Sequence, residues 1–358
     1  MLSDAQFREL VSGRWRGGVA AALRGALGVL EHPYGWIVQR RNARFDRGIV
    51  RPAQVGPPVI GVGNLTVGGT GKTPLVTWLA RWFLARQAAV TVISRGYGAA
   101  SGRPNDEALE LAARLPGVPH LQNPDRVAAA RQALAENPQQ VLILDDAFQH
   151  RRIARDLDMV LLDALEPFGF GRLLPRGLLR EPAAGLARAH IVALSRSDAV
   201  SEQARRDIEA RVRLLAPQAA WLELAHRPCG FISAGGESLP LEELRGLRVA
   251  AFCGIGNPAG FRHTLESCGL VAQDLLALPD HCTYGERELT RVGRWLAGQH
   301  VQYVVCTRKD LVKIPHAELA GKRLVALDIE LEIVRGQTEL EAALTPLATR
   351  VAARELPG

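Results

Sequence analysis

Short runs of apolar and β-branched residues recur along the chain, and longer segments with a helical spacing of apolar residues lie between them. The runs that predict buried strands are 58–62, 89–94, 141–144, 159–162, 191–194 and 221–224. The segments that predict helices are 75–83, 107–115, 124–135 and 202–215. Strands that alternate with helices are typical of a parallel sheet covered on both faces, so we expect an α/β fold.

The alternation breaks near residues 227–242, where Pro, Gly and Ser replace the periodic pattern. A second alternating set follows, with strands predicted at 248–253, near Val271, at 301–306 and at 324–331, and helices from Pro258 and Glu286. A last helix is predicted at 339–355. We therefore divide the chain into an N-terminal segment (1–50), a first α/β domain (51–226), a smaller α/β domain (227–335) and a C-terminal helix (336–358).

The charge of the chain is concentrated at one end. The 358 residues carry a formal net charge of +7, and the first 51 hold nine arginines against four acidic residues, an excess of five (9 − 4). A nucleic-acid-binding domain instead spreads basic residues over one face, interleaved with aromatic residues, so we predict no nucleic-acid partner. The five cysteines include no Cys-x-x-Cys pair, which favours reduced thiols in the cytosol.

The basic N-terminal segment has a moderately apolar centre. Residues 18–30 are mostly Ala, Leu, Val and Gly, with Trp15, Tyr34 and Trp36 near the ends and arginines on both sides. This pattern predicts an amphipathic helix lying on an anionic membrane surface. The alternative is a helix that packs on its own domain with solvated arginines. No run of about 18 apolar residues is present, so we predict no transmembrane helix.

A glycine-rich sequence follows the first predicted strand and precedes the first predicted helix. It comprises Thr66, Val67, Gly68, Gly69, Thr70, Gly71, Lys72 and Thr73. Such a loop turns backbone N–H groups toward phosphate oxygens, and the helix N-terminus adds partial positive charge. Lys72 would reach the β- and γ-phosphates, and the Thr73 hydroxyl would bind Mg²⁺. The chain departs from the usual motif at Thr66, where glycine is common.

Two further sequences follow predicted strands. Asp145 and Asp146 come directly after an apolar strand, the position from which a nucleotide-binding fold presents a carboxylate to Mg²⁺. A capping turn is the plainer interpretation of the pair. Residues 94–98 (SRGYG) place Arg95 and Tyr97 between glycines, which suits either a phosphate contact or a simple turn.

Taken in order, these sequences resemble the tetraacyldisaccharide 4′-kinase family, which makes a lipid A precursor. The resemblance is carried by GVGN (61–64), GGTGKTP (68–74), SRGYG (94–98), DDAFQHRR (145–152), GRLLP (171–175), LREP (179–182), FCGIGNP (252–258), DH (280–281) and TRKD (307–310). It implies a P-loop kinase with ATP as co-substrate and Mg²⁺ as cofactor. The implied reaction moves the γ-phosphoryl group to the 4′-hydroxyl of a tetraacylated glucosamine disaccharide 1-phosphate, at the cytoplasmic face of the inner membrane.

The resemblance also implies roles for single residues. Asp106 is similar to the family's general base, and His281 is similar to the partner of that base. Lys72 would hold phosphate, while Thr73, Asp145 and Asp146 would hold Mg²⁺. The residues implied in acceptor binding are Arg95, Tyr97, Gln149, Arg180 and Glu181.

Three positions depart from the family pattern: Ala147 and Asn105 replace glycines, and Cys282 replaces a histidine. None of them removes a group with an implied chemical role.

Two other classes of protein also have such a glycine-rich loop. A membrane-associated switch ATPase of the partitioning type usually has an additional lysine early in the loop, where this chain has Thr66 and Val67. A nucleic-acid-binding NTPase would show a steep salt dependence of binding.

Overall fold

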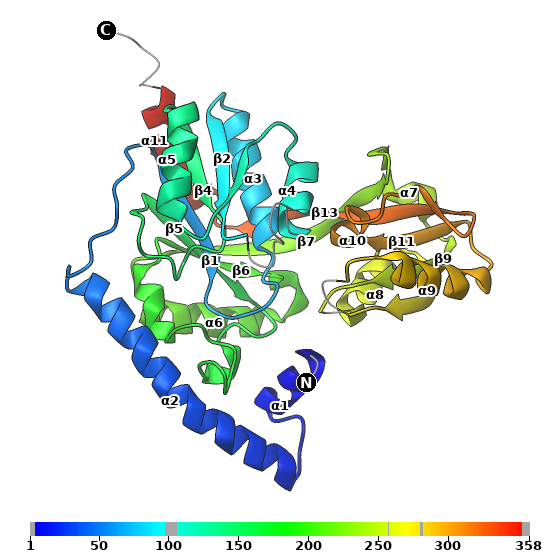
Figure 1. Cartoon of the computed structure of the whole chain (residues 1–358), viewed down its shortest axis with the longest axis horizontal. Helices are drawn as coiled ribbons and strands as arrows, with labels where there is room; N and C mark the ends of the chain where they lie inside the picture. The colour runs from blue at the N-terminus through cyan, green and yellow to red at the C-terminus, as the bar shows by residue number, and fades with distance from the viewer. Residues whose placement is uncertain (1–3, 97–105, 257, 280–281, 353–358) are drawn as a thin grey trace. The chain divides into compact units, whose positions relative to one another are not determined.

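The computed structural model describes residues 4–96, 106–256, 258–279 and 282–352. The chain forms two compact units (Figure 1): Met1–Tyr97, Gly117–Ala225 and Leu331–Gly358 make the first, and Gly98–Pro116 and His226–Glu330 make the second. The boundaries fall within the long strands β7 (Ala220–Ser233) and β13 (Lys322–Arg335). The second unit also takes in residues 98–116, a segment that the sequence analysis assigns to 51–226.

The first unit is built on a parallel sheet. Its strands are β1 (Val59–Asn64), β2 (Ala89–Ser94), β3 (His120–Gln122), β4 (Gln140–Leu144), β5 (Leu157–Asp163), β6 (Ile191–Ser195) and the first part of β7. They lie in the order β7-β6-β5-β1-β4-β2-β3, and each neighbouring pair is parallel. The six predicted strands are confirmed. The short edge strand β3 was not predicted.

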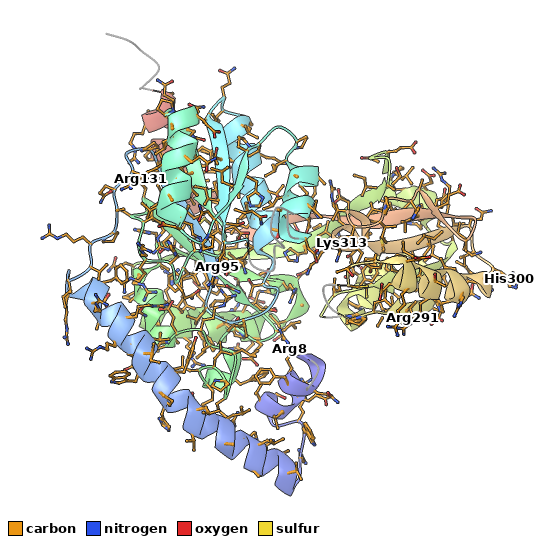
Figure 2. All side chains as sticks on the ribbon, in the orientation of Figure 1. Arg8, Arg95, Arg131, Arg291, His300 and Lys313 are labelled. Atoms are coloured by element: carbon orange, nitrogen blue, oxygen red, sulfur yellow. The ribbon has the colours of Figure 1, made fainter. Side chains whose placement is uncertain are left out.

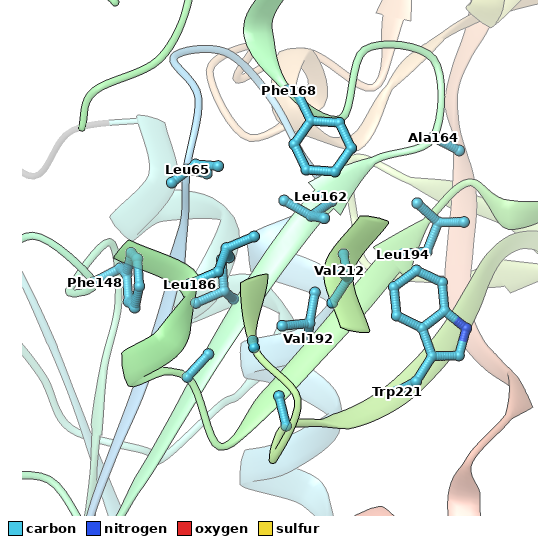
Figure 3. Close-up of a cluster of buried hydrophobic side chains, with 14 of the residues drawn as sticks. Leu65, Phe148, Leu162, Ala164, Phe168, Leu186, Val192, Leu194, Val212 and Trp221 are labelled. Atoms are coloured by element: carbon cyan, nitrogen blue, oxygen red, sulfur yellow. The ribbon is translucent and has the colours of Figure 1, made fainter. Parts of the chain in front are cut away.

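Helices cover this sheet. They are α3 (Lys72–Leu84), α5 (Arg126–Glu136), α6 (Glu202–Leu215) and α11 (Gln337–Ala352), with short 3₁₀ turns η1 (Gly169–Gly171), η2 (Ala183–Arg188) and η3 (Ser197–Ala199). Every residue of β1 and β4 is buried, so both faces of the sheet lie under other elements. One core cluster joins Val192 and Leu194 of β6 to Val212 of α6 and Trp221 of β7 (Figure 3). Burying each such side chain contributes about 1.5–3 kcal/mol.

In the second unit the strands lie in the order β10-β9-β11-β13, with all three pairs parallel. Its remaining elements are α4 (Asp106–Arg114), β8 (Ser238–Leu239), α7 (Leu241–Leu244), β9 (Arg248–Cys253), α8 (Pro258–Ser267), β10 (Val271–Ala277), α9 (Glu286–Ala297), β11 (Tyr303–Thr307), α10 (Arg308–Leu311) and β12 (Glu318–Leu319). α4 belongs here because Arg308 donates to the carbonyl of Ala113 (3.2 Å) and Arg114 pairs with Asp328 (3.3 Å). The predicted class, α/β with a smaller second α/β region, is confirmed.

The N-terminal segment contains two helices, α1 (Asp4–Ser12) and α2 (Gly18–Asp46). α2 continues well past the predicted helical centre. Ala20, Gly35, Val38 and Asn42 repeat on its buried side. The opposite side exposes large apolar side chains, namely those of Val19, Val29, Leu30, Trp36 and Ile37. One side of the helix therefore packs on its own domain and the other stays apolar and open. In the parts of the chain that the structure describes, no helix has the length and apolarity needed to cross a membrane.

Candidate functional site

The glycine-rich loop joins β1 to α3, as the sequence predicts. Gly68 (φ 116°) and Gly71 (φ 84°) take left-handed backbone conformations that favour glycine. Gly71 is also the N-cap of α3, so the positive end of the helix opens directly onto the loop. The Thr70 hydroxyl is buried and has no hydrogen-bond partner among the described residues. An unpartnered hydroxyl beside exposed glycines fits a loop that receives an anionic ligand.

Two other segments hold the loop in place. The turn at residues 172–180 pairs with it, because the N–H of Val67 donates to the carbonyl of Leu178 (2.8 Å) and the N–H of Arg180 donates to the carbonyl of Leu65 (2.9 Å). Arg196, which follows β6, donates to the carbonyl of Gly69 (2.8 Å) and pairs with Asp163 (2.5 Å). The loop is thus fixed from both sides before any ligand contact.

Two carboxylates end β4 beside this loop. Asp145 is buried, and its Oδ1 accepts a hydrogen bond from the N–H of Asp146 (2.8 Å). Asp146 pairs with Lys72 (3.4 Å), and both of its oxygens accept from Arg180 (2.8 Å each). Burial alone would raise the pKa of Asp146, but the charges and hydrogen bonds of Lys72 and Arg180 outweigh it and lower that pKa. The carboxylate is therefore ionised at neutral pH.

The turn that carries these acids is tightly built. Asp146 itself is the left-handed residue (φ 50°), which leaves Ala147 free to replace a glycine without strain. Gly63 of β1 lies directly against this turn, since a Cβ at Gly63 would lie 2.5 Å from the backbone nitrogen of Phe148. The close approach of β1 to the turn brings the two acids next to the loop.

Arg126 is a residue at this site that the sequence analysis missed. It is the first residue of α5, is buried, and donates to the carbonyls of Asp145 (3.3 Å) and Asp146 (3.1 Å). Burial lowers its pKa, while the charges of the two acids oppose that change. In the sequence, Arg126 is one of the chain's many arginines, and it lies in a predicted helix rich in alanine. A buried arginine cannot be recognised there without the fold.

Glu181 lies at the centre of a second polar cluster. It is fully buried, and its carboxylate accepts hydrogen bonds from Gln149 (3.0 Å), Asn42 (2.9 Å) and Arg188 (2.8 Å). Gln149 also donates to the carbonyl of Asn64 (2.9 Å), at the end of β1. One carboxylate therefore links α2, the turn after the paired acids and the 3₁₀ turn η2.

In the second unit, Asp106 starts α4 and forms an ion pair with Lys313 (3.1 Å). The Lys313 side chain is only 6% exposed and also donates to the carbonyl of Cys282 (2.7 Å). The sequence analysis did not select Lys313, which lies 207 residues from Asp106. The backbone carbonyl of Cys282 makes this contact, so the cysteine that replaces a histidine does not disturb it.

The predicted residues are thus found in both units. Lys72, Asp145, Asp146, Gln149, Arg180 and Glu181 gather around the loop of the first unit, whereas Asp106 lies in the second. Arg95 is exposed just after β2. Tyr97 and His281 lie outside the residues that the structure describes. The Asp145 carboxylate and the Thr73 hydroxyl are oxygen donors of the kind that Mg²⁺ prefers, whereas both oxygens of Asp146 already accept from Arg180.

Comparisons with known proteins agree on one family. The sequence profile described as "Tetraacyldisaccharide-1-P 4'-kinase" matches residues 23–349. The tetraacyldisaccharide 4′-kinase of Anaeromyxobacter dehalogenans (strain 2CP-C) is 40% identical over 356 residues, 94% of each chain. That of Halothermothrix orenii is 34% identical over 346 residues, 89% of each chain. The crystal structure of LpxK from Aquifex aeolicus with ATP matches with a TM-score of 0.73 at 28% identity, covering 91% of this chain and 99% of that one.

Proposed function

The chain belongs to the tetraacyldisaccharide 4′-kinase family, and from this membership we propose that it transfers the γ-phosphoryl group of ATP to the 4′-hydroxyl of a tetraacylated glucosamine disaccharide 1-phosphate. The observation that carries the proposal is the cluster of Lys72, Asp146 and Arg180 beside the glycine-rich loop. Phosphoryl transfer depends mainly on positioning and on neutralising charge, which such a cluster supplies. The family membership favours this kinase over a switch ATPase or a nucleic-acid-binding NTPase.

The nucleotide would be held by residues 66–73. The loop amides and the α3 N-terminus bind the phosphates, and Lys72 neutralises the β- and γ-phosphates. Thr73, Asp145 and Asp146 would hold Mg²⁺, which would offset the negative charge of the transferred group. Arg126 keeps the turn of the two acids in place through its bonds to both carbonyls.

We assign the role of general base to Asp106, with His281 as its partner. The Asp106 carboxylate would accept the proton of the 4′-hydroxyl as the phosphoryl group arrives. The ion pair with Lys313 limits the rotamers of the Asp106 carboxylate. Lys313 is therefore a positioning residue, because it acts through Asp106.

We assign acceptor binding to Arg95, Tyr97, Gln149, Arg180 and Glu181. Arg95 is exposed and positive, which suits contact with a phosphorylated sugar. Glu181 is buried and engaged by three donors, so it would act through the residues that it holds.

The acceptor is a lipid, and α2 offers a surface that can reach it. Its open side carries Trp36 and Ile37, and arginines 40, 41 and 44 follow on exposed positions. Apolar and aromatic side chains next to arginines favour the interface of an anionic bilayer. We propose peripheral attachment to the cytoplasmic face of the inner membrane through this helix.

A label-transfer assay tests the proposed reaction. The purified chain is incubated with γ-labelled ATP, Mg²⁺ and the disaccharide monophosphate lipid, and label in the lipid is measured. We expect transfer by the wild type, a loss of about 10²–10⁴-fold for Lys72→Ala, and a loss of turnover with retained ATP binding for Asp106→Asn. If Asp106→Asn abolishes ATP binding and leaves turnover intact, the assignment of the base is wrong. If the wild type transfers no label, the proposed reaction is wrong.

A further inference from the structure

An arginine from the N-terminal helix contacts the phosphate-binding loop. Arg8 lies on α1 and its side chain is exposed (labelled in Figure 2). Its Nη2 lies 2.5 Å from the position that a Cβ atom on Gly68 would occupy. The guanidinium group therefore rests against the Gly68 backbone, and a side chain at this position would have to displace it. Gly68 also has φ 116°, a backbone conformation that favours glycine.

The position of α1 is fixed at its C-terminal end by two other arginines. Arg24 of α2 donates to the carbonyl of Leu10 (3.5 Å), and Arg176 donates to the carbonyl of Val11 (3.1 Å). Leu10 and Val11 are buried. Cationic side chains that bind the last carbonyls of a helix satisfy groups that have no partner within the helix. α1 is thus a docked element.

The loop and α1 are attached to the same turn. Arg176 belongs to the turn at residues 172–180, whose Leu178 carbonyl accepts from the N–H of Val67 (2.8 Å). Thr66 and Leu179 also form an antiparallel bridge. One turn therefore sets both partners of the Arg8–Gly68 contact, so the contact follows from the packing of the domain.

A cation at this point of the loop has a clear chemical use. Backbone amides of a phosphate loop surround the α- and β-phosphates, and the loop lysine reaches the β- and γ-phosphates. Loops of the partitioning type add a lysine near their start, where this chain has Thr66 and Val67. Arg8 brings a positive charge to that stretch from another element. An arginine supplied in this way can neutralise the terminal phosphate during transfer.

We propose that Arg8 binds the γ-phosphate of ATP and stabilises its transfer, so that α1 completes the nucleotide site. This inference rests on the ATP-binding part of the proposed function. The profile match begins at residue 23, so α1 lies outside the part of the chain that the profile covers.

Nucleotide binding without lipid provides the test. The affinities of Arg8→Ala and wild type for ATP and for ADP are compared by calorimetry with Mg²⁺, with Arg14→Ala, an exposed arginine outside α1, as the matched control. We expect Arg8→Ala to weaken ATP about 10-fold and ADP less than about twofold, because ADP lacks the phosphate that Arg8 binds. Arg8→Lys should recover part of the affinity, since it keeps the charge without the planar fork.

Two further measurements separate this role from a structural one. Turnover of Arg8→Ala should fall about 10²-fold, and Arg176→Ala, which releases the C-terminal end of α1, should weaken ATP binding in the same direction. Equal loss of ATP and ADP affinity, or Arg8→Ala values equal to those of Arg14→Ala, would overturn the proposal. A wild type that binds ATP but labels no lipid would refute the proposed lipid reaction and leave this comparison intact.

Discussion

Replacing Glu181 with alanine removes a fully buried carboxylate that accepts from three side chains. Arg188, at 2.8 Å, would lose its ion-pair partner. Breaking a buried pair costs about 3–5 kcal/mol because one charge stays behind. The Arg188 side chain is 21% exposed and can be partly hydrated, which places the cost near the lower limit, at about 3 kcal/mol. Asn42 and Gln149 also lose an acceptor, but contributions within one network do not add.

Urea unfolding followed by tryptophan fluorescence measures this cost. A loss of about 3 kcal/mol lowers the urea midpoint by about 1 M when the slope is about 3 kcal/mol/M. Glu202→Ala is the matched control, since Glu202 pairs with Arg206 on an exposed helix face and should contribute less than about 1 kcal/mol. The urea midpoint of Glu181→Gln should fall between those of the two variants. Its amide keeps one acceptor oxygen, but its NH₂ group faces side chains that also donate. Equal midpoints for Glu181→Ala and Glu202→Ala would refute the reasoning.

Three other predictions concern different parts of the chain. Lys313→Met should lower turnover at least about 10-fold with the KM for ATP unchanged, and Lys313→Arg should restore most of it; a change in the KM for ATP alone would contradict a positioning role through Asp106. Replacing Trp36 and Ile37 with aspartate should reduce binding to anionic vesicles in a flotation assay and leave ATP affinity unchanged; vesicle binding equal to wild type would exclude α2 as the membrane surface. Burial lowers the pKa of His120 to about 4, so between pH 6.5 and 4 the unfolded chain takes up a proton that the folded one does not. The free energy of unfolding should therefore decrease as the pH is lowered through this range, by at most about 3 kcal/mol. The same measurement on His120→Gln should lack this contribution to the pH dependence.

Much of the first unit follows from local pattern. β1, β2 and β4 are apolar runs of the length expected of buried strands, and the glycine-rich loop lies between a strand and a helix as its sequence requires. α6 matches its predicted bounds because its N-cap, Ser201, accepts from the N–H of Ala204 (3.3 Å). Strong periodicity and local capping were sufficient for these elements.

The parts that were not predicted depend on contacts distant in sequence. α1 is docked by Arg24 and Arg176, and neither contact leaves a local signal. Lys313 became relevant only when the fold placed it beside Asp106. Arg126 gives no sign of burial in its helix sequence. Such residues are selected by tertiary packing, which a single sequence does not display.

The inner side of α2 is attached through three hydrogen bonds to other parts of the first unit, besides its buried apolar residues. Asn42 donates to Glu181 (2.9 Å), the Tyr34 hydroxyl donates to the carbonyl of Arg180 (2.8 Å), and Glu31 accepts from the N–H of Leu173 (2.8 Å). Detergent micelles compete with apolar contacts far better than with buried hydrogen bonds. Detergent should therefore coat the open face of this helix while its inner side stays attached, which favours mild nonionic surfactants for purifying the chain intact.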